Sequence, residues 1–192
     1  MNKRQFLGAT AIAGAFPLAG HAAEAASRGP ALLTITGAIG HGNRGPLDPV
    51  LDQMMYKQQL KFDKAYAFDY AALLELAPQT IRPTLEYDAR PHTLRGPLLV
   101  DVLARAGARL DDKTVLVLRA VDGYNVELPL VQAKSRRVIV ATHIDGKPMA
   151  LGGLGPLWAV FDADRVPEMA KLPLPQRFAA CPWALYHIDV RS

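Results

Sequence analysis

Hydrophobic residues along this chain gather in short stretches, rich in Leu, Val and Ile, that glycine and proline separate. Such stretches are typical of strands, because branched side chains pack well on a pleated surface. Two of them are followed by Asp122-Gly123 and Asp145-Gly146, which predict tight turns. A third contains Pro83, which lacks a ladder donor and predicts an edge or bulged strand. The expected strands are residues 31–36, 80–86, 114–119, 125–128, 138–143, 158–161 and 185–190.

Two short helices are expected in the first half of the chain. Asp48-Pro49 is a good helix start, because aspartate accepts bonds from the free N–H groups and proline tolerates the first turn. Asp69 is expected to cap a second helix over residues 70–76, which Pro78 ends. Helical spacing predicts that the first helix buries Val50, Leu51, Met54 and Met55.

Residues 97–106 show the clearest helical pattern of the chain. Pro97 suits a first helical turn, and Gly107 suits a left-handed C-cap. The expected buried face is Leu98, Leu99, Val102 and Leu103. Because strands dominate and the helices are short, the pattern predicts an α+β fold, with mixed or antiparallel sheets and short peripheral helices.

Composition limits the classes of protein that this chain can represent. Of its 192 residues, 50% are hydrophobic and 21% are charged, which fits one globular domain with its own core. The net charge is +4, and the basic residues are scattered without a stripe of interleaved aromatics, so a nucleic-acid partner is not expected. Cys181 is the single cysteine and cannot form an intramolecular disulfide; a small buried hydrophobe is its expected role.

The first 25 residues have the character of an export signal. Lys3 and Arg4 precede the apolar run of residues 6–16, and an A-x-A site predicts cleavage after Ala25. Residues 2–7, NKRQFL, resemble a twin-arginine motif with lysine in the first position; an ordinary secretory signal is the alternative. We therefore expect a signal peptide over residues 1–25, a single periplasmic domain over residues 26–192, and no transmembrane segment after cleavage.

Four segments of the second half, taken in order, point to a family. They are RGPLLVDVL, AVDGYNVELPL, DGKPM and GGLGPLW, at residues 95–103, 120–130, 145–149 and 152–158. Their combination resembles the small exported members of the sulfite-oxidase-type oxidoreductases with a molybdopterin-binding domain, over about residues 32–190. The resemblance implies the fold of that domain, a molybdopterin cofactor and oxygen-atom transfer at its metal, with the cofactor carrying the chemistry.

The cysteine that holds molybdenum in that family is missing here. The matching stretch, residues 83–88, reads PTLEYD, and Cys181 does not match the ligand position. A thiolate suits a metal that is already bound by sulfur, whereas Tyr or carboxylate would be a harder ligand. No metal site is therefore expected, no catalytic residue is identified, and a metal-dependent oxidoreductase activity stays open.

Eight residues are candidates for contacts with a cofactor. The resemblance suggests a polar, anion-contacting loop at Asn43 and Arg44, and metal or oxyanion contacts near Tyr87, Arg90 and His92, because guanidinium and imidazolium groups bind oxyanions. The alternative for these segments is a solvated loop or turn. The remaining candidates are Tyr124 in a hairpin, and Gly153 and Gly155, where a ligand can approach the backbone or a tight loop can place Trp158 in the core.

Two functions of different classes remain. The first is an exported oxidoreductase-like protein that binds a pterin cofactor, molybdopterin being the expected form. The second is a non-catalytic periplasmic binding or sensory module that has lost the metal and signals to a membrane-protein partner, with a small molecule or anion as its ligand. A structural exported protein is the third. A pterin-sized cleft lined by Asn43, Arg90 and Tyr124 would favour the first, and a core filled by side chains the second.

Overall fold

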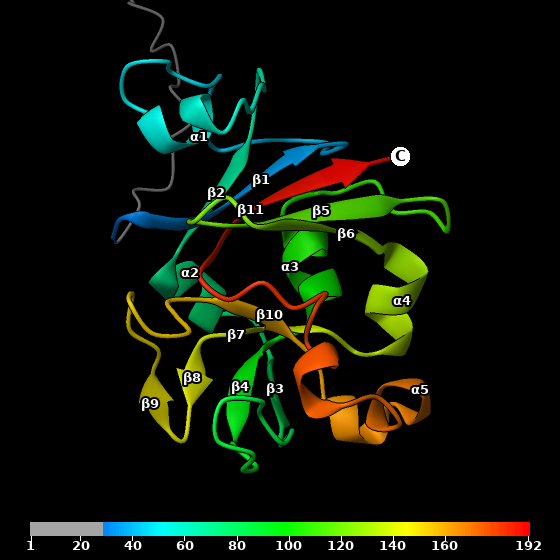
Figure 1. The fold of residues 1–192 in the computed structure, drawn as a ribbon. Helices are drawn as coiled ribbons and strands as arrows, with labels where there is room; N and C mark the ends of the chain where they lie inside the picture. Colours follow the sequence, from blue (N-terminus) through cyan, green and yellow to red (C-terminus); the bar gives the residue numbers. More distant parts are fainter. Residues whose placement is uncertain (1–28) are drawn as a thin grey trace, which may run out of the picture.

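A five-stranded mixed sheet forms one side of the molecule (Figure 1). The computed structural model describes residues 29–192, so the expected signal peptide lies outside the described residues. The strand order is β2-β1-β11-β5-β6; β1 and β11 are parallel and the other neighbours are antiparallel. The bounds are Ala31–Gly37 for β1, Tyr66–Asp69 for β2, Val115–Ala120 for β5, Asn125–Pro129 for β6 and Leu185–Arg191 for β11.

Two smaller antiparallel sheets lie on the other side of the core. One has the order β3-β4-β8-β9, and the second pairs β10 with β7. Gly96 in β4 is required there, because an added Cβ would lie 1.9 Å from the carbonyl oxygen of Val140. The bounds are Pro78–Ile81 for β3, Leu94–Pro97 for β4, Ile139–Ala141 for β7, His143–Ile144 for β8, Lys147–Pro148 for β9 and Trp158–Val160 for β10.

The helices are short and lie around or between these sheets. Helix α3 lies between the five-stranded sheet and the β7–β10 pair (Figure 1). It buries Leu99, Val102 and Leu103 of the expected face, whereas Leu98 precedes the helix and is half-buried. The bounds are Gln53–Lys57 for α1, Tyr70–Leu74 for α2, Leu99–Arg105 for α3, Leu130–Ser135 for α4 and Pro167–Ala170 for α5, with 3₁₀ turns η1 at Ala163–Arg165 and η2 at Leu174–Gln176. The expected α+β class with mixed and antiparallel sheets is confirmed.

Several local predictions are also confirmed by hydrogen bonds and backbone angles. The Ala72 amide donates to Asp69 Oδ1 at 2.7 Å, so Asp69 caps α2. Gly107 has φ +68 at the end of α3, and Gly123 has φ +92 in the hairpin between β5 and β6. Among residues 29–192, no helix has the length and hydropathy needed to cross a membrane.

The expected first helix is wrong in its start and in its buried face. Asp48 does accept bonds from the Val50 and Leu51 amides, at 2.7 and 3.1 Å, but these close a turn, and α1 begins only at Gln53. Val50 and Leu51 are 73% and 82% exposed, and of the expected face only Met55 is buried. Capping is a local event, whereas the buried face depends on what packs against the helix.

Two proline positions also differ from expectation. Pro97 ends β4 instead of opening α3, and Leu98 is the N-cap residue. The strand expected over residues 80–86 ends at Ile81, ahead of Pro83. Proline has no N–H to donate, so the ladder stops there and the chain turns. The strand expected over residues 138–143 is likewise divided, into β7 and β8.

Candidate functional site

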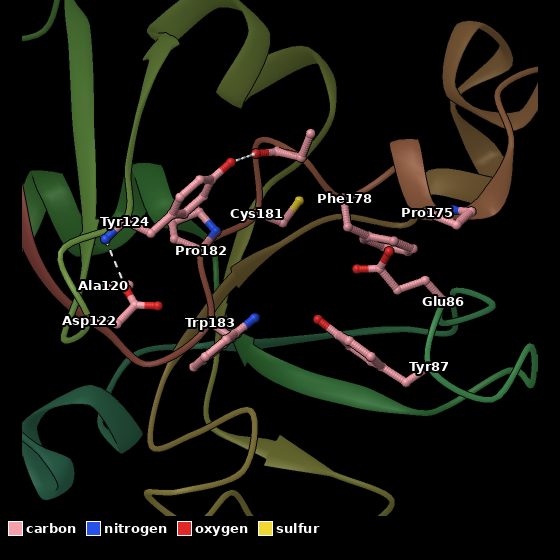
Figure 2. Close-up of a pocket in the computed structure, with 11 residues that line it drawn as sticks. Glu86, Tyr87, Ala120, Asp122, Tyr124, Pro175, Phe178, Cys181, Pro182 and Trp183 are labelled. Carbon is pink, nitrogen blue, oxygen red and sulfur yellow. Dashed lines mark hydrogen bonds between the residues drawn. The ribbon is translucent and has the colours of Figure 1, made fainter.

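An aromatic pocket of about 270 Å³ opens where three loops meet (Figure 2). The loop after β3 supplies Glu86 and Tyr87, and the turn between β5 and β6 supplies Asp122 and Tyr124. The segment before β11 supplies the third wall. We call this site the aromatic pocket; its principal lining residues are Glu86, Tyr87, Asp122, Tyr124, Cys181 and Trp183.

The loop that carries Glu86 and Tyr87 is anchored at its base. Leu85 is 2% exposed and plugs into the core, and its amide donates to the Arg90 carbonyl at 2.9 Å. The Thr84 amide donates to Asp164 Oδ2 at 2.7 Å, which ties the loop to η1. The buried Leu85 side chain and the charge-assisted bond to Asp164 hold the base of this loop, and Glu86 and Tyr87 lie at the mouth of the pocket.

The hairpin wall is held by its own turn chemistry. Asp122 Oδ1 accepts the Tyr124 amide at 2.9 Å, an Asx-type bond that stabilises the turn. The Tyr124 hydroxyl donates to the Ala179 carbonyl at 2.7 Å, across the pocket wall (Figure 2). Tyr124 is thus fixed at both ends, and its ring forms a rigid side of the pocket.

The third wall runs beside β10. The backbone of Trp183 forms an antiparallel bridge with Trp158, and the Ala159 amide donates to the Pro182 carbonyl at 3.3 Å. The buried Trp158 donates from Nε1 to the Cys181 carbonyl at 2.8 Å. These bonds align the segment along a core strand and leave the Trp183 indole at the surface.

Three large aromatic side chains are exposed around this one pocket. Tyr87 is 57% exposed, Tyr124 50% and Trp183 38%. The rings of Tyr87 and Trp183 lie across from each other, with the Tyr87 hydroxyl directed toward the indole nitrogen (Figure 2). Grouped, solvent-exposed aromatics mark binding sites, because their faces gain stacking and apolar contact when a ligand covers them.

The electrostatics of the pocket are acidic. Glu86 and Asp122 line it, and no Lys, Arg or His does so among residues 29–192. Burial raises the pKa of Tyr87, the neighbouring Glu86 carboxylate raises it further, and the Trp183 indole opposes the rise. The pocket therefore offers hydrogen-bond acceptors to a ligand and disfavours an anion.

The eight residues expected to contact a cofactor are distributed over several places. Tyr87 and Tyr124 meet in the aromatic pocket. His92 and Gly153 line a second hollow, of about 480 Å³, beside the turn between β8 and β9. Neither hollow is lined by the other four, Asn43, Arg44, Arg90 and Gly155.

Asn43 and Arg44 make contacts within their own loop region. Asn43 accepts the Ala67 amide at 2.6 Å and donates to the Ala67 carbonyl at 2.8 Å, so it completes the edge of β2. Arg44 pairs with Asp52 and stacks its guanidinium 5.2 Å from the Phe62 ring centre. Both side chains have structural partners that account for their placement.

His92 lies between two carboxylates. Its Nδ1 is 2.7 Å from Asp145 Oδ2, and its Nε2 is 3.0 Å from Asp88 Oδ2. These hydrogen bonds raise the pKa of His92, Asp145 contributing most. His92 thus clamps the loop of residues 82–93, which we call the pocket loop, to the turn between β8 and β9. Arg90 in the same loop donates its amide to Asp88 at 3.1 Å.

Gly155 is packed too closely for a side chain. An added Cβ would lie 2.5 Å from the Cβ of Met149, so the backbone approaches a neighbouring segment there. An added Cβ at Gly153 would lie 3.6 Å from the Ala150 carbonyl oxygen, an ordinary contact, and the Gly153 amide donates to that carbonyl at 3.2 Å. Of these two glycines, Gly155 is the one that needs its small size, and it packs against protein.

The donor set does not fit a thiolate-held molybdenum. Cys181 is 4% exposed, and burial raises the pKa of its thiol to about 12, so it is protonated at neutral pH. The stretch at residues 83–88, where the family's ligand would lie, offers Pro83 buried and Glu86 and Tyr87 at the pocket. Within residues 29–192, no three or more His, Cys, Asp or Glu side chains are grouped to hold a metal.

Sequence reasoning missed four residues of the pocket. Trp183 was not among the candidates, although a tryptophan directly after a proline was a usable signal. Asp122 was predicted only as part of a turn, and Glu86 only as part of a strand. Phe178, which packs 6.1 Å from the Trp158 ring, lies in a segment with no periodic pattern. The three loops are far apart in the sequence, and the folded structure brings them together.

The fold is one that known structures share. No protein-family model and no curated protein sequence matches this chain. In fold, the chain resembles the sulfite-oxidase type of domain. It is similar to the sulfane dehydrogenase SoxCD from Paracoccus pantotrophus, with a TM-score of 0.52 and 13% identity over 82% of this chain. The match spans 37% of the SoxCD chain. At this identity the similarity concerns the fold.

Proposed function

We propose that this chain is a non-catalytic binding domain that holds a small planar heterocycle of the pterin class, without molybdenum, in the aromatic pocket. One observation carries the proposal: three exposed aromatic rings and two carboxylates surround a single pocket, and no cationic side chain of residues 29–192 lines it. The resemblance to molybdopterin-binding domains supplies the pterin class.

The aromatic rings account for the planarity of the ligand. Tyr87 and Trp183 lie across from each other at the mouth (Figure 2), and a flat ring system gains stacking contact with such faces. Base-like heterocycles gain about 1–3 kcal/mol per aromatic partner. The pocket volume of about 270 Å³ suits one bicyclic ring better than a whole metal cofactor.

The carboxylates account for the polar edge of the ligand. A pterin presents an amino group and a ring N–H side by side, and a carboxylate accepts two such parallel hydrogen bonds. Glu86 is the carboxylate beside Tyr87 and Phe178 (Figure 2). We assign Glu86 to the amino-pyrimidine edge, and Asp122 stays with its turn because it already accepts the Tyr124 amide.

The cellular role follows from the expected export signal. We propose that the domain works in the periplasm and reports the presence of its ligand to a membrane-protein partner. Alkaline phosphatase fused after residue 25 tests the first part, since that enzyme is active only outside the cytoplasm. Because a twin-arginine route would leave this reporter inactive, cell fractionation of the full chain accompanies it, and recovery of the chain only in the cytoplasm would overturn the export proposal. Ligand-dependent cross-linking to a membrane protein tests the second.

The first experiment measures what the protein carries and how the pocket binds it. Protein from cells that make both pterins and molybdenum cofactor is assayed for pterin fluorescence and for molybdenum by elemental mass spectrometry. We expect pterin without stoichiometric metal. Molybdenum near one atom per chain would overturn the proposal and would favour the oxidoreductase alternative.

Binding of biopterin to purified protein then tests the assignment of residues. Trp183→Ala and Glu86→Gln are each expected to raise the Kd about tenfold or more, because they remove one stacking face or one bidentate acceptor. Trp183→Phe keeps a ring and is the matched control. Unchanged Kd values in both variants would show that biopterin does not use this pocket.

A further inference from the structure

A second concave site, separate from the aromatic pocket, is rich in arginine. It encloses about 420 Å³ between β3, the end of α4 and η1. Four guanidinium-bearing side chains line it, and Asp162 is its one carboxylate. We call it the arginine hollow; its arginines are Arg82, Arg136, Arg137 and Arg165.

The arginine at the end of α4 is held in place by the core. Arg136 is 14% exposed in its side chain, its Cζ lies 5.3 Å from the ring centre of Phe161, and its Nε is 3.8 Å from Glu168 Oε1. An aromatic face beneath a guanidinium fixes its plane and leaves its edge for other partners. Arg136 is therefore a preorganised donor.

The other three arginines are exposed and have spare donors. Arg137 donates from Nη2 to Gln79 Oε1 at 2.9 Å, and Arg165 Nε is 3.5 Å from Asp162 Oδ2. Arg82 is exposed, and its charge lowers the pKa of Asp145, a carboxylate outside the hollow. Each guanidinium has five N–H donors, so most remain unused.

The charge of the hollow points to an anion. Asp162 pairs with Arg165 and accepts the Arg82 amide at 3.3 Å, so it balances one guanidinium. Glu168, outside the lining, faces Arg136. Arg137 donates to the neutral amide of Gln79, and Arg82 shares Asp145 with His92, so the hollow keeps an excess of positive charge. Guanidinium groups match phosphate oxygens with parallel hydrogen bonds, which makes arginine the usual residue for such recognition.

We propose that the arginine hollow binds the phosphate group of a soluble phosphate monoester. Its volume exceeds that of one phosphate and leaves room for an attached organic group. Its charge is opposite to that of the aromatic pocket, which within the described part of the chain is lined by two carboxylates and by no cation. The two sites therefore select different ligands, and this proposal stands whether or not the aromatic pocket binds a pterin.

Isothermal titration of the full chain with ribose 5-phosphate tests the proposal, with ribose as the matched neutral probe. We expect ribose 5-phosphate to bind and ribose not to bind. Affinity for ribose 5-phosphate should fall as salt is raised, because the contacts are charged and partly exposed. The absence of binding at millimolar ribose 5-phosphate would overturn the proposal.

Variants distinguish binding in the arginine hollow from nonspecific attraction to a basic surface. Arg82→Ala and Arg137→Ala are each expected to weaken ribose 5-phosphate about tenfold, and together more, since each removes a charge-assisted bond. Arg109→Ala makes the same charge change at an exposed position outside the hollow and should leave binding unchanged. An equal loss in Arg109→Ala would overturn the proposal. Trp183→Ala should not affect this binding, which distinguishes it from the pterin site.

Discussion

Two histidines in different regions of this protein have pKa values that are shifted in opposite directions. His187 lies in β11 of the five-stranded sheet, is 1% exposed, and has its Nε2 3.0 Å from Thr36 Oγ1. Burial lowers its pKa to about 4. His92 lies in the pocket loop between two carboxylates, which raise its pKa. Burial in the sheet thus disfavours the charged form of His187, and the two carboxylates in the loop region favour the charged form of His92.

The same contrast extends to the rest of the two regions. Backbone hydrogen bonds join the strands of the five-stranded sheet, and apolar side chains pack against it. The sheet supplies only the hairpin wall of the aromatic pocket. The chain after β3 serves both proposed sites: Arg82 lines the arginine hollow, and Glu86 and Tyr87 line the aromatic pocket. Loops carry the chemistry here because a rigid sheet positions them.

The largest expected effect is the loss of folding stability on acidification, to which the buried His187 contributes. The folded-state pKa of His187 is about 4 against an ordinary value of 6.5, so its contribution to stability is present above pH 6.5 and is lost as pH falls toward 4. The full loss is about 3 kcal/mol. Urea unfolding at pH 7 and pH 4 should show a smaller difference in His187→Gln than in the wild type.

The control for the acid experiment is an exposed histidine. His41→Gln makes the same substitution at an exposed histidine and is the matched control variant. NMR titration of the wild-type imidazole measures the His187 pKa directly, independently of whether the variant folds well. A His187 pKa near 6.5 would contradict the contrast between the two regions.

Asp164 is expected to have the next largest effect, because it holds the loop region together. Its carboxylate accepts Arg177 Nη1 at 2.8 Å and the Thr84 amide at 2.7 Å. Asp164→Ala should cost about 2 kcal/mol, the range of bonds to charged groups. Hydrogen exchange should quicken at Thr84 and its neighbours while the β1 amides stay protected.

A matched surface aspartate sharpens that measurement. Asp112 is 87% exposed in its side chain and lies 3.9 Å from Lys134, so Asp112→Ala should change stability little. If Asp164→Ala quickened exchange equally in β1, the loops and the sheet would unfold as one unit, and the distinction between the regions would fail.

The smallest expected effect is that of the His92 clamp. Because its folded pKa is raised above 6.5, the stability it contributes is present below pH 6.5 and is lost as pH rises through the raised pKa. His92→Asn should remove this alkaline loss. The readouts are the NMR titration of the His92 ring and exchange of the Thr93 amide, which donates to Asp145 at 2.9 Å. A ring pKa at or below 6.5 would contradict the clamp.

Some elements of the fold were predictable because their signals are local. Asp69 caps α2 within three residues, and Gly107 ends α3 with a backbone angle that glycine adopts freely. The strand patterns of β1, β5 and β11 likewise lie within single stretches of chain. These features depend on residues that are neighbours in sequence.

Other features depended on packing between distant segments. The fixed φ of proline suits the first turn of a helix as well as a strand, so Pro97 alone does not decide between them. It ends a strand because β4 pairs with β3 and β8. Val50 and Leu51 follow a helical spacing, yet no element of the described chain covers them. Local propensity is weak compared with the free energy of burying a strand or a helix face.

By itself, the sequence of this protein determined the α+β class, the tight turns, the helix caps at Asp69 and Gly107 and the single hydrophobic core, because these follow from side-chain period and backbone freedom over a few residues. Only the tertiary structure decided that Tyr87, Tyr124 and Trp183 meet at one pocket and that four arginines face another. Those residues lie far apart along the chain, and strand pairing and core packing bring them together. The opposite pKa shifts of His92 and His187 have the same origin, since burial and carboxylate neighbours exist only once the chain has folded.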